Sequence, residues 1–127
     1  MIFSIVSVVE DDPMVRDSTV DLLNSYEYTA LGFETAEEFL NSGEVANTYC
    51  LITDQQLPGL SGTDLQQHLR AAGYQTPVIF ITAHPSPTVR DAALAAGAIA
   101  FLTKPFHDAV LLDCLQTALN SRPHQSA

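Results

Sequence analysis

The chain has 127 residues, with five Lys and Arg against fifteen Asp and Glu, and a formal net charge of −10 at pH 7. Its length fits one domain, and a hydrophobic fraction of 46% is enough for a buried core and too high for a disordered chain. The acidic balance argues against direct binding to nucleic acid or to an anionic membrane surface, because both depend on Lys and Arg.

The cysteines and the N-terminal stretch predict a soluble, cytoplasmic protein. Cys50 and Cys114 each lie in an apolar run without the neighbours of a zinc site, so we expect two buried thiols and no disulfide. The N-terminal apolar stretch has no basic start and runs directly into acidic residues. A signal peptide has a basic start, and a membrane span needs about twenty apolar residues.

Short apolar runs alternate with segments of helical periodicity. The first run, residues 5–9, is rich in β-branched residues and predicts a buried strand. Asp12-Pro13 predicts a helix start, because Asp is a good N-cap and proline suits the first helical turn. Thr35 and Ser61 begin further helices, since each has an acidic residue three positions later. Strands are also predicted at residues 28–33, 49–53, 77–81 and 99–103.

Three later helical segments carry apolar faces. The first has the spacing of one helix face at Leu65, His68, Leu69 and Ala72. The second repeats this spacing at Val89, Ala92, Ala93 and Ala96. The last includes residues 110–115, which have more apolar side chains than one buried stripe requires, so we expect some of them at the surface.

The alternation of five strands with five helices predicts the fold class. Strands separated by helices cannot pair as hairpins, so we expect a parallel sheet. Three of the strands are apolar nearly throughout, which is typical when helices cover both faces. With right-handed crossovers, we expect a flavodoxin-like, doubly wound (βα)5 sheet in the order 2-1-3-4-5.

Polar residues stand where four of the predicted strands end. In a sheet of this order, ligands bind beyond the carboxyl ends of the strands, where the winding direction reverses. We therefore expect these side chains to share one crevice. They are Glu10, Asp11, Asp12, Asp54, Thr82 and Lys104.

This donor set suits phosphoryl transfer. Clustered carboxylates repel one another unless one protonates or a cation joins them, and oxygen ligands favour Mg²⁺. Mg²⁺, an ammonium and a hydroxyl together neutralise and orient a phosphoryl group, and a carboxylate can accept it as an acyl phosphate. Singly, each residue has an ordinary role, such as an N-cap for Asp12 or a solvated side chain for Lys104. Four strand ends on one rim favour a functional site.

Four segments together resemble the receiver domain of two-component response regulators. They are Val9-Glu10-Asp11-Asp12-Pro13, residues 51–62 (LITDQQLPGLSG), Ile81-Thr82-Ala83 and Lys104-Pro105-Phe106. The resemblance covers residues 3 to about 120, and its specificity lies in the combination. The Phe106 region is similar to the receivers of the nitrogen-fixation regulator group.

The resemblance implies a phosphorylation site and a metal site. Asp54 would accept a phosphoryl group from a sensor histidine kinase or a histidine phosphotransfer protein. Mg²⁺ would be bound by Asp11 directly, by Glu10 through water, by Asp54, and by the backbone carbonyl of Gln56.

The resemblance also implies the phosphoryl-binding and switch residues. Thr82 would hydrogen-bond the phosphoryl group, and Lys104 would pair with Asp54 or with the phosphoryl oxygens. Pro105 corresponds to the family's proline after the lysine, which often follows a cis peptide bond. Phe101 occupies the aromatic switch position that responds to Thr82, although plain core packing explains it equally well.

The loop after Thr82 is less typical. Pro85 and Pro87 restrict the backbone there, so we expect a smaller or differently shaped switch. Gln56 and His84 either flank the phosphoryl group or are merely solvated. The three other histidines, at positions 68, 107 and 124, are expected at the surface.

An output face and two domain arrangements follow from the resemblance. The face would comprise residues 87–96, 99–103 and 108–121, and it would serve a homodimer or an effector. Residues 1–121 would form the receiver domain, with residues 122–127 as a C-terminal tail or the start of a linker. Receivers of the nitrogen-fixation group normally precede a DNA-binding domain. The chain is thus either a stand-alone regulator or the receiver of a longer transcriptional regulator.

Two other functional classes compete with this interpretation. A phosphoaspartyl phosphatase would have D-x-D-x-[TV] after its strand, and the segment from Asp54 to Gln56 lacks the second Asp. An interaction module that is never phosphorylated would not need Asp11, Asp54, Thr82 and Lys104 together. We therefore expect a signalling switch rather than an enzyme. A nucleotide-binding fold is disfavoured, because neither G-x-G-x-x-G nor a P-loop occurs.

Overall fold

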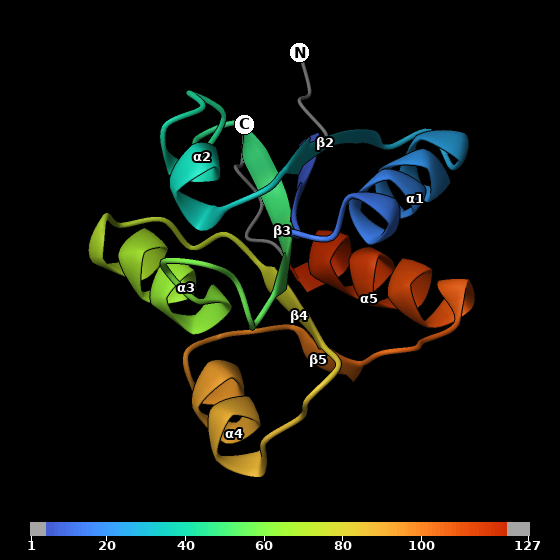
Figure 1. Cartoon of the computed structure of the whole chain (residues 1–127). Coiled ribbons are helices and arrows are strands. Elements are labelled where there is room, and N and C mark those ends of the chain that lie inside the picture. Colours follow the sequence, from blue (N-terminus) through green and yellow to red (C-terminus); the bar gives the residue numbers. More distant parts are fainter. Residues whose placement is uncertain (1–4, 122–127) are drawn as a thin grey trace.

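The computed structural model describes residues 5–121, which form alternating strands and helices (Figure 1). The strands are β1 (Ile5–Val9), β2 (Thr29–Phe33), β3 (Thr48–Asp54), β4 (Val78–Thr82) and β5 (Ala100–Thr103). The helices are α1 (Pro13–Ser25), α2 (Ala36–Leu40), α3 (Gly62–Ala71), α4 (Pro87–Ala95) and α5 (Asp108–Ser121). Each predicted strand agrees to within one residue at either end. The expected tail, residues 122–127, and His124 lie outside the described residues.

The strands form one parallel sheet in the order β2-β1-β3-β4-β5, which confirms the predicted doubly wound fold. Its register aligns the carboxyl ends of neighbouring strands: Val9 is opposite Thr53, and Asp54 is opposite Ile81. Because β1 and β3 are adjacent and the chain winds outward from them in both directions, the crevice expected for a ligand lies beyond these two strands.

Helices cover both faces of the sheet, and each face has its own core (Figure 1). Alternate residues of one strand point to opposite faces, so Ile52 of β3 lies in the core beneath α1 and α5, whereas Leu51 lies in the core beneath α2, α3 and α4. This arrangement explains why the central strands are apolar at nearly every position.

The predicted helix caps are present. Asp12 Oδ1 accepts hydrogen bonds from the amides of Met14 and Val15, and the Ser61–Asp64 capping box is complete. The spacing that begins at Thr35 forms only half of a capping box. Thr35 caps α2, but the carboxylate of its acidic partner accepts the amide of Glu34 at 2.8 Å and not that of Thr35.

The predicted faces of α3 and α4 require correction. On α3, Leu65 and Leu69 are buried and His68 is exposed, as expected for that histidine. Ala72 of the same predicted face is exposed, and Gln66 is buried. Gln66 Nε2 donates to the carbonyl oxygen of Ala93 at 3.2 Å, so the buried face of α3 is turned toward α4.

Helix α4 buries less than its spacing predicted. Of its nine residues, which all lie in the described part of the chain, only Ala93 is buried. Small alanine side chains leave little apolar area to remove from water, so periodic alanines give a weaker packing signal than periodic leucines.

The surplus of apolar residues on α5 is partly exposed, as expected. Val110 is 41% exposed, whereas Leu111 and Leu115 are fully buried. The prediction of two buried thiols is half right, because Cys50 is buried and Cys114 is half-buried. Within residues 5–121, none of the helices combines the length and the hydropathy that a membrane crossing requires.

Candidate functional site

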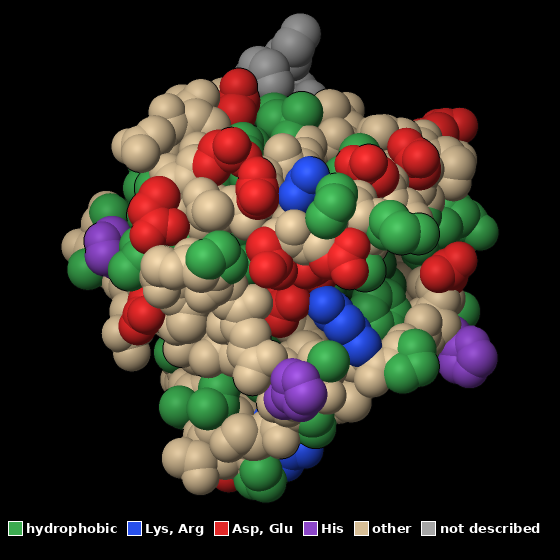
Figure 2. All heavy atoms as spheres, in the orientation of Figure 1, with side chains coloured by type: hydrophobic (Ala, Val, Ile, Leu, Met, Phe, Trp, Pro, Cys, Tyr) green, Lys and Arg blue, Asp and Glu red, His purple; other side chains and the backbone are tan. Residues whose placement is uncertain are grey.

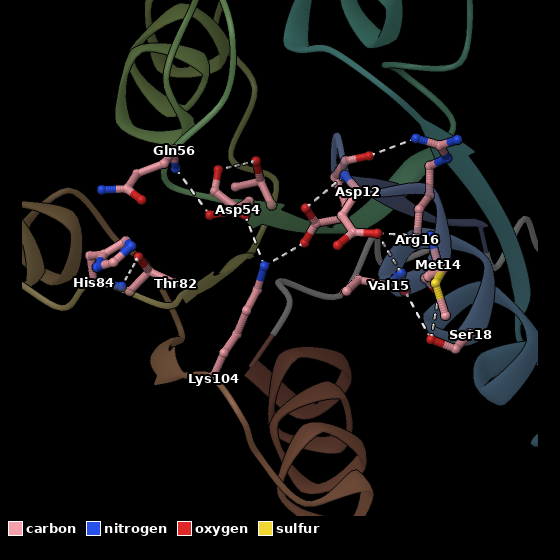
Figure 3. Close-up of polar contacts among 12 residues, drawn as sticks. Asp12, Met14, Val15, Arg16, Ser18, Asp54, Gln56, Thr82, His84 and Lys104 are labelled. Atoms are coloured by element: carbon pink, nitrogen blue, oxygen red, sulfur yellow. Dashed lines mark hydrogen bonds and ion pairs between the residues drawn. The ribbon is translucent and has the colours of Figure 1, made fainter.

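The polar residues predicted at the strand ends converge beyond β1 and β3. Figure 3 shows Lys104 extended toward Asp54, with Thr82 to one side of them beside His84. On the surface, acidic side chains gather around a basic one in the middle of the face drawn in Figure 2. The fold therefore builds one charged crevice from segments that are far apart in the sequence.

Glu10 follows β1 and is almost entirely inaccessible, with 1% of its surface exposed. Its amide donates to the carbonyl of Phe33 at 2.9 Å, and its Oε2 accepts the amide of Asp12 at 3.2 Å. Burial raises the pKa of the Glu10 carboxyl above its ordinary value, and the nearby charge of Asp54 also raises it, against the lowering effect of the bond from Lys104. A cation near Glu10 would favour its ionised form.

Asp54 is the last residue of β3 and is 6% exposed. Its two carboxylate oxygens have different partners. Oδ1 accepts the amide of Gln56 at 3.0 Å, whereas Oδ2 accepts a hydrogen bond from Lys104 Nζ at 2.9 Å. These two hydrogen bonds hold the carboxylate of Asp54 in one orientation.

Lys104 follows β5 and joins the two buried acids. Its Nζ donates to Glu10 Oε1 at 2.8 Å and to Asp54 Oδ2 at 2.9 Å. Burial alone would lower the pKa of Lys104, but the hydrogen bonds and charges of the two carboxylates outweigh it, so the pKa is raised. The next peptide bond, Lys104–Pro105, is cis.

Three carboxylates in the crevice fit a hard divalent cation. Glu10, Asp11 and Asp54 each offer an oxygen, and these oxygens lie within 4.8 Å of one another. Asp11 is exposed, which leaves its oxygens accessible to a metal and its waters. Oxygen ligands at this spacing suit Mg²⁺. The fourth acid, Asp12, serves as the N-cap of α1.

The side chain of Gln56 is exposed, and its backbone amide is bonded to Asp54. The next residue in the loop, Leu57, is half-buried. The bond to Asp54 holds the backbone of Gln56 beside that carboxylate, whereas Glu10 and Asp11 come from the loop after β1.

Thr82 ends β4 and is fully buried. Its Oγ1 accepts the amide of His84 at 3.1 Å, and the exposed His84 side chain lies beside it in Figure 3. Phe101 of β5 is half-buried, and its ring lies 5.6 Å from that of Phe80 between centroids. Thr82 leads into the loop before α4, and Phe101 lines a hollow together with Pro87 and Arg90 of α4.

The two prolines after Thr82 have different places. Pro87 is the first residue of α4, with Ser86 as the N-cap, so its missing amide costs no helical hydrogen bond. Pro85 is exposed in the loop itself. The size of any switch in this loop stays a prediction.

Sequence reasoning missed two residues that hold the loops of the site. Arg16 Nη1 donates to the carbonyl oxygen of Glu10 at 2.9 Å, and Glu37 of α2 accepts the amide of Leu60 at 3.1 Å. Neither bond corresponds to a recognisable sequence motif, because each joins a side chain to the backbone of another segment, and a backbone acceptor or donor can belong to any residue type. The one available signal was that Arg16 is among five basic residues and follows the acidic pair closely.

Comparisons with known proteins agree with this geometry. A family model described as the response regulator receiver domain matches residues 6–116. Nodulation protein W of Bradyrhizobium diazoefficiens is 42% identical over 115 residues, which are 91% of this chain and 51% of that protein. Transcriptional regulatory protein FixJ of Azorhizobium caulinodans is 34% identical over 120 residues, which are 94% of this chain and 57% of that protein.

A solved structure matches nearly the whole chain. The crystal structure titled FixJ-N superposes with a TM-score of 0.84 at 29% identity, covering 96% of this chain and 98% of that one. The predicted resemblance to the nitrogen-fixation regulator group is thereby confirmed. The chain spans about half the length of the curated relatives that it matches.

Proposed function

The chain belongs to the family of response regulator receiver domains, and from this premise we propose that Asp54 is its phosphoacceptor. The donor is the phosphohistidine of a sensor histidine kinase or of a histidine phosphotransfer protein. The domain is a signalling switch of a two-component system, and the transfer depends on Mg²⁺.

One observation carries the proposal. Asp54 is a buried carboxylate whose Oδ2 is held by Lys104, next to two further acids that offer oxygens within 4.8 Å. Two buried acids and one exposed acid repel one another, so a divalent cation beside them would lower the free-energy cost of the cluster. The family membership identifies the chemistry.

The residues of the crevice suit Mg²⁺. Glu10, Asp11 and Asp54 would bind it with the backbone carbonyl of Gln56, and waters would complete the octahedron. When bound, the metal would neutralise the negative charge of the phosphoryl oxygens. Its binding would also relieve the repulsion between the three carboxylates.

The remaining side chains have defined tasks in the transfer. An oxygen of Asp54 attacks the phosphorus, the new O–P bond forms as the P–N bond of the phosphohistidine breaks, and the imidazole leaves with the electron pair. Lys104 Nζ lies 2.9 Å from Oδ2 and would pair with a phosphoryl oxygen once the bond has formed. The hydroxyl of Thr82, whose oxygen accepts the amide of His84, would donate its proton to another phosphoryl oxygen.

We infer that the output is read on α4, β5 and α5. A shift of Thr82 toward the phosphoryl group would change the space beside Phe101, whose ring already contacts Phe80. The face would bind a second copy or an effector. In the longer relatives that are named as regulators, a receiver of this kind would control transcription through another part of the protein.

The experiment is the intact mass of the chain after incubation with a small phosphodonor. We expect wild type with Mg²⁺ to gain one phosphoryl group, and wild type with excess chelator to gain none. Asp54→Asn should gain none under either condition while keeping its fold. Asp17→Asn, which changes an exposed acid on α1, is the matched control and should be labelled normally. Labelling of Asp54→Asn equal to wild type would refute the proposal.

A further inference from the structure

We propose that Arg16 is a positioning residue for the metal site, and that Gly32 provides the space it needs. Its guanidinium would hold the backbone of Glu10 so that the side chains of Glu10 and Asp11 face the bound cation. The inference rests on the proposed function, because it concerns the same Mg²⁺ site. It adds a residue that does not itself touch metal or phosphoryl group.

The guanidinium of Arg16 binds backbone and not carboxylate. Nη1 donates to the carbonyl oxygen of Glu10 at 2.9 Å, and Figure 3 shows Arg16 extended from α1 across the loop that precedes it. Among residues 5–121, Arg16 forms no ion pair within 4.0 Å of a carboxylate. The guanidinium therefore acts here as a hydrogen-bond donor to the backbone and not as the partner of an acid.

This bond fixes the peptide plane between the two metal-binding acids. The carbonyl of Glu10 and the amide of Asp11 belong to one planar peptide unit. On its other side, the amide of Glu10 donates to the carbonyl of Phe33 at 2.9 Å. The backbone of Glu10 is thus tied to β2 through its amide and to α1 through its carbonyl, which leaves the plane that precedes Asp11 little freedom to rotate.

Gly32 gives the stem of Arg16 its path over β2. A β-carbon built on Gly32 would lie 3.0 Å from Cγ of Arg16, 3.2 Å from its Cδ and 3.3 Å from Cγ2 of Val20. The φ of Gly32 is not positive, so the position needs glycine for space and not for backbone conformation. Glycine weakens a strand, and here the open space is filled by the methylene groups of Arg16.

Positioning and simple charge predict opposite effects of removing the guanidinium. A positive charge near a cluster of acids competes with a metal cation, so on charge alone its removal would strengthen Mg²⁺ binding. If Arg16 holds the loop in its binding geometry, its removal lowers the affinity, because the acids must then be ordered by the metal itself.

The test is the Mg²⁺ affinity of Arg16→Met, measured by calorimetric titration of the full 127-residue chain. Methionine keeps an apolar stem over Gly32 and removes the donor. We expect the dissociation constant to rise about tenfold, in the range measured for lost support of metal ligands. The matched control is Arg90→Met, which removes an exposed guanidinium on α4 and should leave the affinity unchanged.

A second variant tests the role of Gly32 with all charges kept. Gly32→Ala pushes the stem of Arg16 aside, and we expect a rise in the dissociation constant that is smaller than for Arg16→Met. Combined with Arg16→Ala, which removes the stem, Gly32→Ala should add no further loss. If Arg16→Met does not fold, the Mg²⁺ dissociation constant of the single variant Gly32→Ala tests the proposal: a rise supports the positioning role, and an unchanged value contradicts it.

The outcomes separate this inference from the proposed function. Wild-type affinity or tighter binding in folded Arg16→Met overturns the positioning role, even if wild type binds Mg²⁺ and Asp54 is labelled. A full additional loss from Gly32→Ala on top of Arg16→Ala overturns the role of Gly32. A wild-type chain that binds no Mg²⁺ overturns the proposed metal site, and the inference with it.

Discussion

The acidic crevice lies beyond the strand ends and helix α4 covers one face of the same sheet, and the two regions are held in different ways. In the crevice, Glu10 and Asp54 are buried and share Lys104, and the surrounding loops are tied to other elements by Arg16 and Glu37. On α4, only Ala93 is buried among its nine described residues, and Leu94 is 40% exposed.

The difference in burial affects how each region can take part in signalling. Chemistry needs groups that are fixed before the reaction, because ordering them during it costs free energy. A region with little buried apolar area reorganises at lower cost. We infer that the ordered crevice binds the phosphoryl group and that α4 responds to it.

The attachment of α4 is concentrated at its C-terminal end. Gln66 Nε2 donates to the carbonyls of Ala93 and Ala96, and Arg70 Nε donates to the carbonyl of Ala96 at 3.1 Å. Its N-terminal end follows the loop from Thr82. Movement of that loop would therefore tilt α4 about its better-held end.

The largest expected contrast comes from truncating one leucine on each of two helices. Leu65→Ala on α3 opens a cavity in the core, and we expect it to lower the free energy of unfolding by about 2–5 kcal/mol. Leu94→Ala on α4 should cost about 0.5 kcal/mol or less, as is usual for surface positions. Urea unfolding of both variants measures the difference. Equal losses would mean that α4 is packed as firmly as α3.

A smaller effect is expected from Mg²⁺ on the crevice. A ligand that binds the folded state alone should add about 1.4 kcal/mol of stability at ten times its dissociation constant. Thermal unfolding with increasing Mg²⁺ checks this, and Asp11→Asn, which changes an exposed ligand, should reduce the response. A melting temperature that does not respond to Mg²⁺ would count against the metal site.

The next effect concerns the attachment of α4. Gln66→Leu removes the donor to Ala93 and Ala96, and we expect a loss of about 1 kcal/mol, the usual net value of such a hydrogen bond. Amide exchange should become faster at the C-terminal end of α4 and stay unchanged in β1 and β3. Gln67→Leu, at the exposed neighbouring position, is the control. Unchanged amide exchange along α4 in Gln66→Leu would show that the hydrogen bonds from Gln66 do not hold this helix.

The smallest effect concerns Cys114 on α5. Burial raises the pKa of its thiol, and the charge of Asp113 raises it further. The folded state then holds this proton more tightly than the unfolded state. Its stabilising contribution is present below the ordinary pKa of 9.0 and is lost as the pH rises through the folded value. Urea unfolding between pH 8 and about 10.5 should show a steeper loss for wild type than for Cys114→Ser. Parallel curves would contradict the assignment.

The fold and the crevice could be predicted because their signals are local. Apolar runs defined the strands, Asp12 and Ser61 marked helix starts, and parallel pairing brought the strand ends together. The polar residue at each strand end then defined the site without knowledge of its exact geometry.

The supporting contacts could not be predicted, because they depend on tertiary placement. Gln66 and His68 flank the stripe of Leu65 and Leu69 on opposite sides of the helix, and the sequence spacing grouped His68 with the two leucines. The structure buries Gln66 instead, because the carbonyls of α4 lie there and satisfy its amide. The bond from Arg16 to the carbonyl of Glu10 is likewise a contact between a side chain and a backbone group that only the folded arrangement brings together.

The most direct test locates the phosphoryl group within the chain. Peptide mapping after transfer from a phosphorylated histidine donor, with Mg²⁺ present, should find the modification at Asp54 and nowhere else. Modification of Glu10 or Asp11 in place of Asp54, or no transfer from any such donor under conditions where the chain is folded and binds Mg²⁺, would contradict the role of the crevice.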